Sequence, residues 1–404
     1  MDFEDTPEEA AYREKVRSYI EANKSKLTPG GRYADASKED QQASQATLFD
    51  GGFMGIGLPK EYGGQGGTPI QQAIVNQELA EAGIAGPINN IGMGMCAPTI
   101  IAHGSKDQQD RYLKRLLRAD DVWCQLFSEP ASGSDLAGLR TTAVREADGN
   151  WRINGQKVWT TGAQFSDYGI LLTRTDPSLP KHRGLTMFVL NMHAPGVTVR
   201  PLKQMSGRSQ FNEVYFDDVI IPDSERLGDV NDGWRVALTT LMNERVNVGG
   251  GGSELGIPAE DLLKHARERL PQLSETDRVL ATRDLGEILV DALGSRYTGY
   301  RVLSKLSKGE APGPEASAGK LSGTRVARAG ADLGVRLLGD EGAMAATADG
   351  SNLWQSTEAG LPGLAIAGGT NEVLRNIIGE RVLHLPAEPR LDKTAPFSEG
   401  TKKA

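Results

Sequence analysis

The spacing of apolar residues changes twice along this chain of 404 residues. Up to about residue 120 they recur at helical spacing, and Thr6-Pro7-Glu8-Glu9 combines the capping hydroxyl, early proline and glutamate of a helix start. From about 121 to 231 the apolar runs are short, and Gly, Pro, Asp and Ser separate them as they separate strands. Helical spacing returns at Gly233 and continues to about Leu385. This order predicts an α+β fold with a strand-rich middle.

The same pattern predicts the domain organisation. We expect an N-terminal helical domain (1–120), a middle β domain built as a small barrel or sandwich (121–231), a C-terminal helical domain (232–385) and a loose polar tail (386–404). Asn154-Gly155 is expected to form the turn of a hairpin. The charged run from Ser105 to Arg111 is interpreted as the solvated end of the third helix, and a helix break is expected at 360–363.

Composition excludes several classes of protein. The net charge of −8 argues against nucleic-acid binding, which usually needs a basic surplus. No apolar run approaches the length of a membrane span, and the acidic start Met1–Asp5 is typical of neither a secretory signal nor a transit peptide. The two cysteines and five scattered histidines form no disulfide framework and no metal-ligand spacing. We therefore expect a cytoplasmic protein without a metal, whose chemistry comes from carboxylates, hydroxyls or an organic cofactor.

Two segments of the middle region carry groups that could bind a ligand. The stretch from Cys124 to Asp135 places hydroxyl residues and glycines where they can offer donors to a polar ring edge or a phosphate. Further on, Lys157-Val158-Trp159-Thr160-Thr161-Gly162 puts an aromatic plane and two hydroxyls at the end of a strand. A turn with a buried tryptophan is equally compatible with that spacing.

Two segments of the last third are further candidates. Glu244 follows Ala237 by seven residues and so lies nearly above it on the apolar stripe of a helix. A carboxylate there costs free energy unless it is paired or functional, so both an ion pair with a neighbouring arginine and a general base remain open. The Gly-rich stretch Ala367–Glu372 opens a helix with Thr370 in the capping position, where free N–H groups suit anionic or carbonyl oxygens. An ordinary capped helix is the simpler interpretation of that stretch.

Taken together, these segments resemble the acyl-CoA dehydrogenase family from about residue 5 to residue 386. Each motif is weak alone, but the ordered set is highly specific. The motifs are Pro59-Lys60-Glu61-Tyr62-Gly63-Gly64, Ser128-Glu129-Pro130 with Gly133-Ser134-Asp135, Asn154-Gly155-Gln156-Lys157-Val158-Trp159-Thr160-Thr161, Phe216-Asp217-Asp218-Val219 with Pro222, Gly233-Trp234, and Gly369-Thr370-Asn371-Glu372.

The resemblance implies an N-terminal helical domain, a middle β domain and a C-terminal four-helix bundle, with FAD as the cofactor. The family reaction is α,β-dehydrogenation of an acyl-CoA thioester: a carboxylate removes the α proton, and the β hydride passes to flavin N5. By matching position, the residues along the isoalloxazine ring are expected to be Gln125, Phe127, Ser128, Trp159, Thr160 and Thr161, with the Thr161 hydroxyl near N5. Ser134 is expected near the thioester, and Thr370 and Glu372 are expected to contact the cofactor.

The position of the catalytic base departs from the commonest family pattern. Most members carry a glutamate immediately before the Gly-Thr of the C-terminal loop, where this chain has Gly368. A branch with isovaleryl-type and long-chain-type enzymes carries the base on a helix immediately before an arginine, and Glu244-Arg245 matches that branch. Glu244 is therefore expected to be the base, with Arg245, Gly368 and Gly369 on the substrate side.

The remaining expectations concern the cofactor's adenosine half and the partners. The segment that contacts this half in the family is altered here, and the resemblance assigns Arg336 and Gly339 of this segment to cofactor binding. The resemblance implies an electron-transfer flavoprotein as electron acceptor and a homotetramer or homodimer. A partner subunit of a heteromeric acyl-CoA dehydrogenase, and a flavin monooxygenase or oxidase on the same fold, are the alternatives.

Overall fold

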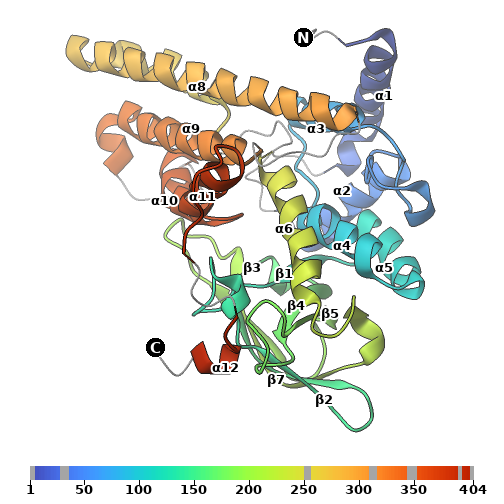
Figure 1. Cartoon of the computed structure of the whole chain (residues 1–404). Helices are drawn as coiled ribbons and strands as arrows, with labels where there is room; N and C mark the ends of the chain where they lie inside the picture. Colours follow the sequence, from blue (N-terminus) through green and yellow to red (C-terminus); the bar gives the residue numbers. More distant parts are fainter. Residues whose placement is uncertain are drawn as a thin grey trace. The chain divides into compact units, whose positions relative to one another are not determined.

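The structure is a computed structural model that describes residues 5–27, 36–249, 256–308, 316–343, 353–389 and 394–400. The chain divides into two compact units (Figure 1). The β unit comprises Met1–Leu202, Gln210–Glu244 and Pro389–Ala404, and the bundle unit comprises Lys203–Ser209 and Arg245–Glu388.

The first part of the β unit is helical, as the sequence predicts. Its helices are α1 (Pro7–Asn23), α2 (Lys38–Asp50), α3 (Pro69–Glu81), α4 (Ala97–His103) and α5 (Lys106–Arg118). The predicted capping box at Thr6 is confirmed, since the Thr6 hydroxyl accepts a bond from the Glu9 N–H and the Glu9 carboxylate accepts one from the Thr6 N–H. An apolar cluster that includes Val16, Leu48 and Ile74 holds α1, α2 and α3 together.

The prediction for the charged run from Ser105 to Arg111 is wrong about where the helix ends. The preceding helix α4 stops at His103, and Ser105 caps a new helix, α5, by accepting a bond from the Gln108 N–H. Lys106 and Asp110 are exposed, as a solvated face requires. Gln108 is instead buried, because its amide donates to backbone carbonyls at the end of the β region. A strong cap thus starts a helix where charge alone suggested an end.

The second part of the β unit is an eight-stranded sheet in the order β6-β7-β3-β2-β4-β5-β8, with β1 paired to β4. The strands are β1 (Trp123–Leu126), β2 (Thr142–Arg145), β3 (Trp151–Thr161), β4 (Tyr168–Arg174), β5 (Leu185–Asn191), β6 (Val197–Leu202), β7 (Phe211–Ile221) and β8 (Arg226–Leu227). β1 and β2 run parallel to β4, and the other pairings are antiparallel. The inward residues of β3, β5 and β7 form one apolar core.

The expected hairpin turn at Asn154-Gly155 is wrong, because β3 runs straight through these residues. The register against β7 shifts between Ile153 and Gly155, and Gly155 has a φ of 144°. A Cβ on Gly155 would lie 2.7 Å from the Cα of Thr141, so only glycine fits at this bulge. The hairpin between β2 and β3 turns instead before Asn150, where Gly149 has a φ of 89°.

The bundle unit is built from long helices. α6 (Gly233–Gly249) begins in the β unit, and α7 (Ala259–Arg269), α8 (Glu275–Ser307), α9 (Ala316–Leu337), α10 (Leu353–Ile366) and α11 (Asn371–Arg381) follow. Figure 1 shows α8 as a long helix beside α9. The expected break at 360–363 is wrong, since α10 continues with Pro362 inside it. Leu361 is buried against Ala327 and Ala331 of α9, and this packing offsets the hydrogen bond that proline cannot make.

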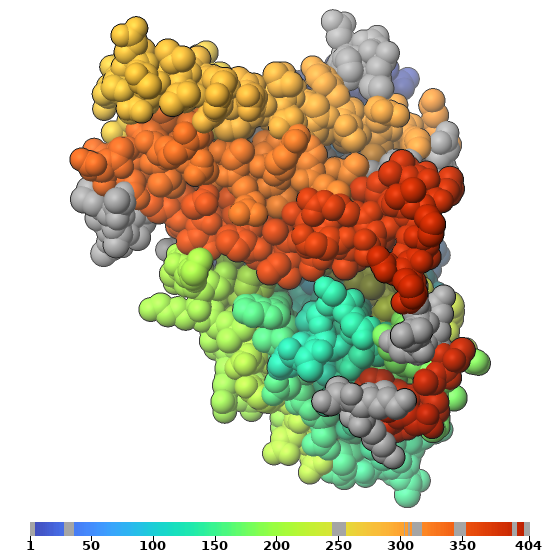
Figure 2. Space-filling model, turned by 60° about the vertical axis from the view of Figure 1, so that its left-hand side comes forward, coloured from blue at the N-terminus to red at the C-terminus, as the bar shows by residue number. Residues whose placement is uncertain are grey.

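The end of the chain is not loose over the described residues 394–400. The backbone N–H of Phe397, in the short helix α12 (Phe397–Gly400), donates to Leu179 O at 2.9 Å. The guanidinium of Arg174 lies 3.9 Å from the centre of the Phe397 ring. Figure 2 shows this segment, in red, against the teal and green surface of the β unit. The prediction of a loose tail is therefore wrong for residues 394–400, where both the backbone and the ring of Phe397 contact the β unit.

No helix among the described residues is both long enough and apolar enough to cross a membrane.

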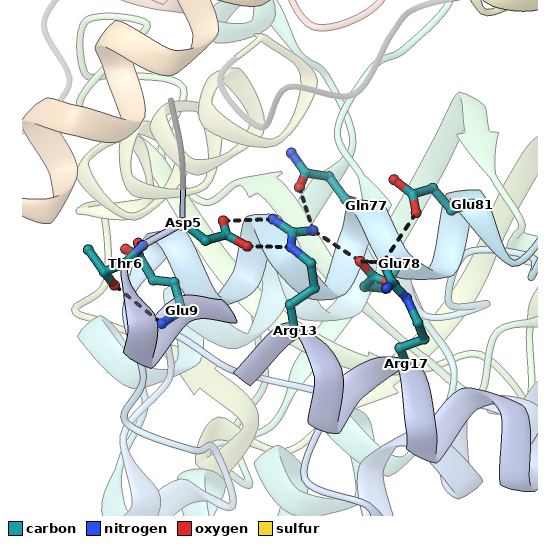
Figure 3. Close-up of polar contacts among 8 residues, drawn as sticks. All are labelled: Asp5, Thr6, Glu9, Arg13, Arg17, Gln77, Glu78 and Glu81. Atoms are coloured by element: carbon teal, nitrogen blue, oxygen red, sulfur yellow. Dashed lines mark hydrogen bonds and ion pairs between the residues drawn. The ribbon is translucent and has the colours of Figure 1, made fainter. Parts of the chain in front are cut away.

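A buried carboxylate ties α1 to α3 (Figure 3). The Glu78 side chain is 3% exposed and accepts bonds from Arg13 at 3.0 Å and from Arg17 at 2.9 Å. Arg13 also binds Asp5, and this hydrogen bond lowers the pKa of the Asp5 carboxyl below its usual value. Because both arginines reach solvent more readily than Glu78 does, the buried carboxylate depends on them rather than the reverse.

We predict that replacing both arginines, in an Arg13→Met/Arg17→Met variant, lowers the opening free energy of α1 and α3 by about 3 kcal/mol, because Glu78 is left charged and unpaired. Hydrogen exchange of the α3 amides measures this opening. Adding Glu78→Gln should recover most of the loss, and the control Glu81→Gln, at an exposed carboxylate 3.8 Å from Arg17, should change it by less than about 0.5 kcal/mol. Unchanged protection in the double variant would contradict this account.

Candidate functional site

The predicted site residues lie in both units of the chain. The β unit contains Gln125, Phe127, Ser128, Ser134, Trp159, Thr160, Thr161 and Glu244, and the bundle unit contains Arg336, Gly339, Gly368, Gly369, Thr370 and Glu372. Arg245 continues helix α6, but its side chain lies outside the described residues.

Glu244 and Gln125 meet within the β unit. The Gln125 amide nitrogen, on β1, lies 3.5 Å from a carboxylate oxygen of Glu244 on α6, which is a long polar contact. Earlier turns of α6 bury Ala237 and Thr240 completely. Glu244 lies on the same face of α6 as these two residues and is half-buried, in agreement with the predicted apolar stripe. The Glu244 carboxylate therefore lies beside Gln125, a residue that the family resemblance assigns to the flavin.

The end of β3 presents an aromatic ring outward. Trp159 has a φ of 61°, which is unusual for a residue with a bulky side chain, and its register against β7 is interrupted between Lys157 and Thr160. The Trp159 side chain is 60% exposed and meets the ring of Phe211 edge-on. The alternative of a buried tryptophan in a turn is therefore wrong. Such backbone strain persists where the surrounding structure enforces it, commonly at ligand sites.

The two threonines after Trp159 offer hydroxyls. The Thr161 side chain is exposed, while the Thr160 hydroxyl is buried without a hydrogen-bond partner among the described residues. A buried polar atom without a partner is uncommon in a folded protein. The exposed Trp159 ring and the exposed Thr161 side chain suit a flat aromatic group with polar edges.

The loop after β1 contributes through its backbone. Phe127 is buried in the core, so its ring is not available to a ligand, whereas Ser128 is half-buried and Ser134 is exposed. Asp135, next to Ser134, forms an ion pair with Lys181 at 2.9 Å. Any contact between Phe127 and a flavin must therefore come from its main chain.

A buried ion pair beneath this loop was not recognised from the sequence. Lys157 is completely buried, and its ammonium lies 2.9 Å from the carboxylate of Glu129. Burial lowers the pKa of Lys157 to about 8, and Glu129 opposes that shift. Burial also acts to raise the pKa of Glu129, but the Lys157 charge and neighbouring donors hold it below its usual value. Both residues stand inside the quoted motifs, yet nothing in the sequence shows that they pair.

The Gly-rich loop of the bundle unit is held by a second buried lysine. Gly368 and Gly369 have φ values of 67° and 87°, and Thr370 caps α11 by accepting a bond from the Val373 N–H. The Lys320 ammonium of α9 donates to Gly369 O at 2.9 Å and to the Asn371 side chain at 3.2 Å. The loop is thus fixed in shape by Lys320, a residue that was not recognised from the sequence.

Among the other bundle residues, Arg336 and Glu372 already pair with charged side chains on the surface. Arg336 donates to Asp284 and Asp332, each at 2.9 Å, and Gly339 starts the short turn Gly339–Ala343 with a φ of 59°. Glu372 is exposed and pairs with Arg375 at 3.3 Å. Among the described residues, no cluster of three or more His, Cys, Asp or Glu could hold a metal ion.

Comparison with known protein families covers nearly the whole chain. The model for the N-terminal domain of acyl-CoA dehydrogenases matches residues 6–120, the middle-domain model matches 124–219, and the C-terminal-domain model matches 231–383. These matches confirm the resemblance and the predicted α+β fold.

Individual proteins agree with the family models. The chain is 39% identical to acyl-CoA dehydrogenase FadE34 of Mycobacterium tuberculosis over 87% of its own length, but it spans only 47% of that relative. It is 35% identical to acyl-CoA dehydrogenase IpdE1 of the same organism, over 87% of this chain and 90% of IpdE1. Among solved structures, the ChsE4-ChsE5 complex from M. tuberculosis aligns with a TM-score of 0.79 and 31% identity, over 96% of this chain and 100% of the matched one.

The three matched domains, in order along one chain, and a relative of similar length at 35% identity leave one assignment. The chain belongs to the acyl-CoA dehydrogenase family.

Proposed function

We propose that the chain catalyses FAD-dependent α,β-dehydrogenation of an acyl-CoA thioester to the trans-2-enoyl-CoA, with Glu244 as the base. The observation that carries this proposal is the approach of the Glu244 carboxylate to Gln125, in the unit where β3 presents Trp159 outward. Family membership supports the reaction class.

The chemistry requires a base and a stabilised oxygen. The α proton of a thioester is only weakly acidic, so the thioester oxygen needs donors as negative charge develops on it. Glu244 is proposed to accept the α proton. The backbone N–H groups of Gly368 and Gly369 are proposed as donors to the oxygen, with Arg245 and Ser134 also on the substrate side. The hydrogen bond from the Lys320 ammonium to Gly369 O supports this role, because it fixes the loop. A donor that is already in position needs no reorganisation of the loop during the reaction.

The flavin is proposed to bind along β1 and β3. Gln125, Trp159, Thr160 and Thr161 would contact the isoalloxazine ring, together with the backbone of Phe127 and Ser128. The exposed Trp159 ring and the unpartnered Thr160 hydroxyl support this assignment. FAD, when bound, supplies the hydride acceptor that no side chain provides.

The rest of the cofactor is assigned to the bundle unit. Thr370 and Glu372 are proposed to contact FAD from the C-terminal loop, and Arg336 and Gly339 are proposed for its adenosine half. Arg336 would have to release Asp284 or Asp332 to reach a phosphate, so its contribution requires a rearrangement.

The proposal extends to partners and location. We propose an electron-transfer flavoprotein as electron acceptor, a cytoplasmic location, and a homotetramer or homodimer. Apolar side chains exposed on α8, which lies at the surface in Figure 2, support association. They are Val279, Leu280, Val290, Leu293 and Tyr297.

A second candidate is a partner subunit of a heteromeric acyl-CoA dehydrogenase. The similar ChsE4-ChsE5 structure is a complex of two named proteins, and this observation favours the alternative. A flavin monooxygenase or oxidase on the same fold would not need a base at Glu244, and oxygen consumption would reveal it.

The decisive test is anaerobic reduction of the bound flavin. The purified chain is mixed with short, branched, long and sterol-type acyl-CoAs in turn, and the flavin absorbance is recorded. We predict that one class bleaches the flavin without oxygen. Flavin that no acyl-CoA bleaches, but that turns over with oxygen, would replace the proposal with the oxidase alternative.

We predict that Glu244→Gln retains bound FAD and lowers the rate of flavin reduction by at least about 100-fold, because the α proton loses its acceptor. Stopped-flow absorbance measures the rate. The control Glu61→Gln, at an exposed glutamate, should reduce at the wild-type rate. Wild-type reduction by the Glu244 variant would show that another group is the base.

We also predict that the chain expressed alone binds one FAD per protomer and elutes as a homo-oligomer. Absorbance after denaturation gives the flavin content, and light scattering gives the mass. A colourless protein that acquires flavin only with a homologous partner would establish the heteromeric alternative.

A further inference from the structure

We infer that the buried Lys157–Glu129 pair is a positioning device that fixes two flavin-lining segments, Phe127–Ser128 and Trp159–Thr161, relative to each other. The inference rests on the proposed function, because it concerns the same flavin site. Neither residue of the pair is expected to touch the flavin.

Lys157 joins β3 to the loop after β1. Its ammonium donates to Phe127 O and to the Glu129 carboxylate, both at 2.9 Å. The next residue, Val158, donates its backbone N–H to Ser128 O at 2.9 Å. β1 ends at Leu126, so the Phe127 and Ser128 carbonyls lie beyond it and find their donors on β3. Two consecutive residues of β3 thus hold two consecutive residues of the loop.

Glu129 extends the connection to a third segment. Its carboxylate accepts backbone bonds from Arg140 at 2.6 Å and from Thr141 at 2.9 Å. The Glu129 backbone also exchanges two hydrogen bonds with Ser132, which closes the loop. The Thr141 hydroxyl returns to β3 by donating to Gln156 O at 3.1 Å. The pair is therefore the centre of a closed network around the loop.

The network flanks the strained residue of β3. Trp159, with its positive φ, follows Lys157 by two positions. On its other side, the side-chain amide of Asn212 donates to Thr160 O at 3.0 Å. With both neighbours anchored, the Trp159 backbone has little freedom to relax into an ordinary strand. The strain and the outward ring therefore depend on these anchors.

Stability alone does not account for a charged pair in this place. Replacing a buried ion pair by apolar residues of similar volume is often neutral or stabilising, since desolvation offsets the attraction. A buried ammonium is satisfied only in the arrangement that supplies all its acceptors, whereas an apolar side chain accepts many arrangements. The pair is thus suited to fixing geometry.

The test compares Lys157→Met with the double variant Lys157→Met/Glu129→Gln, and measures both FAD affinity and the melting temperature of the FAD-free protein. The single variant leaves the buried Glu129 carboxylate without its ammonium partner, so the protein should melt at a lower temperature. It also releases the Phe127 carbonyl from β3, so FAD should bind at least tenfold more weakly. The double variant removes both buried charges but keeps a side-chain oxygen that can accept the Arg140 and Thr141 N–H groups. It should recover the melting temperature, but not the FAD affinity or the visible circular dichroism of the flavin. The control Arg152→Met, on the same strand as Lys157, breaks ion pairs with the half-buried Glu146 and the exposed Asp218 that lie outside this network, and it should leave both readouts unchanged.

Recovery of FAD affinity together with the melting temperature in the double variant would overturn the inference, since the pair would then serve stability only. If the single variant fails to fold, the double variant alone decides. A wild-type chain that binds no FAD would overturn the proposed function as well. A wild-type chain that binds FAD and is bleached by an acyl-CoA, with variants that match its affinity, would overturn this inference alone.

Discussion

The candidate site depends on the backbone conformation of strand β3. This strand pairs with β7 over most of its length, yet its last residues must turn a large aromatic ring away from the core. Two irregularities make this possible: the bulge at Gly155, where Thr141 approaches too closely for any side chain, and the left-handed residue Trp159. Buried polar groups on both sides of Trp159 hold the strand in this form.

The sequence predicts the elements of this chain better than their ends. The capping signature at Thr6 correctly predicts the start of α1 because it is local, and local hydrogen bonds need no tertiary information. Asn154-Gly155 misleads for the same reason: the dipeptide is typical of a turn, but the approach of Thr141, which no local pattern reveals, makes it a bulge. The predicted break at 360–363 and the predicted loose tail around Phe397 are wrong because packing against distant residues decides the local structure there.

The candidate site also combines residues that the sequence reveals with residues that only the tertiary structure reveals. The motif residues were found from the ordered resemblance, and the position of Glu244 agrees with its helical periodicity. Lys157, Glu129 and Lys320 were missed as structural anchors, because a buried lysine in the sequence looks the same as an exposed one. Their partners are mostly backbone carbonyls and N–H groups, which carry no sequence signal. The residues that hold a site in shape are therefore the hardest to recognise without coordinates.

The central claim is that the outward end of β3 is the platform for the flavin. A structure of the chain with FAD bound tests it most directly. The account predicts the isoalloxazine ring in contact with the Trp159 side chain and with Gln125, and the Thr161 hydroxyl within hydrogen-bond distance of flavin N5. An isoalloxazine ring bound away from β3, or a Trp159 that relaxes to negative φ and turns inward in the holoprotein, would contradict it.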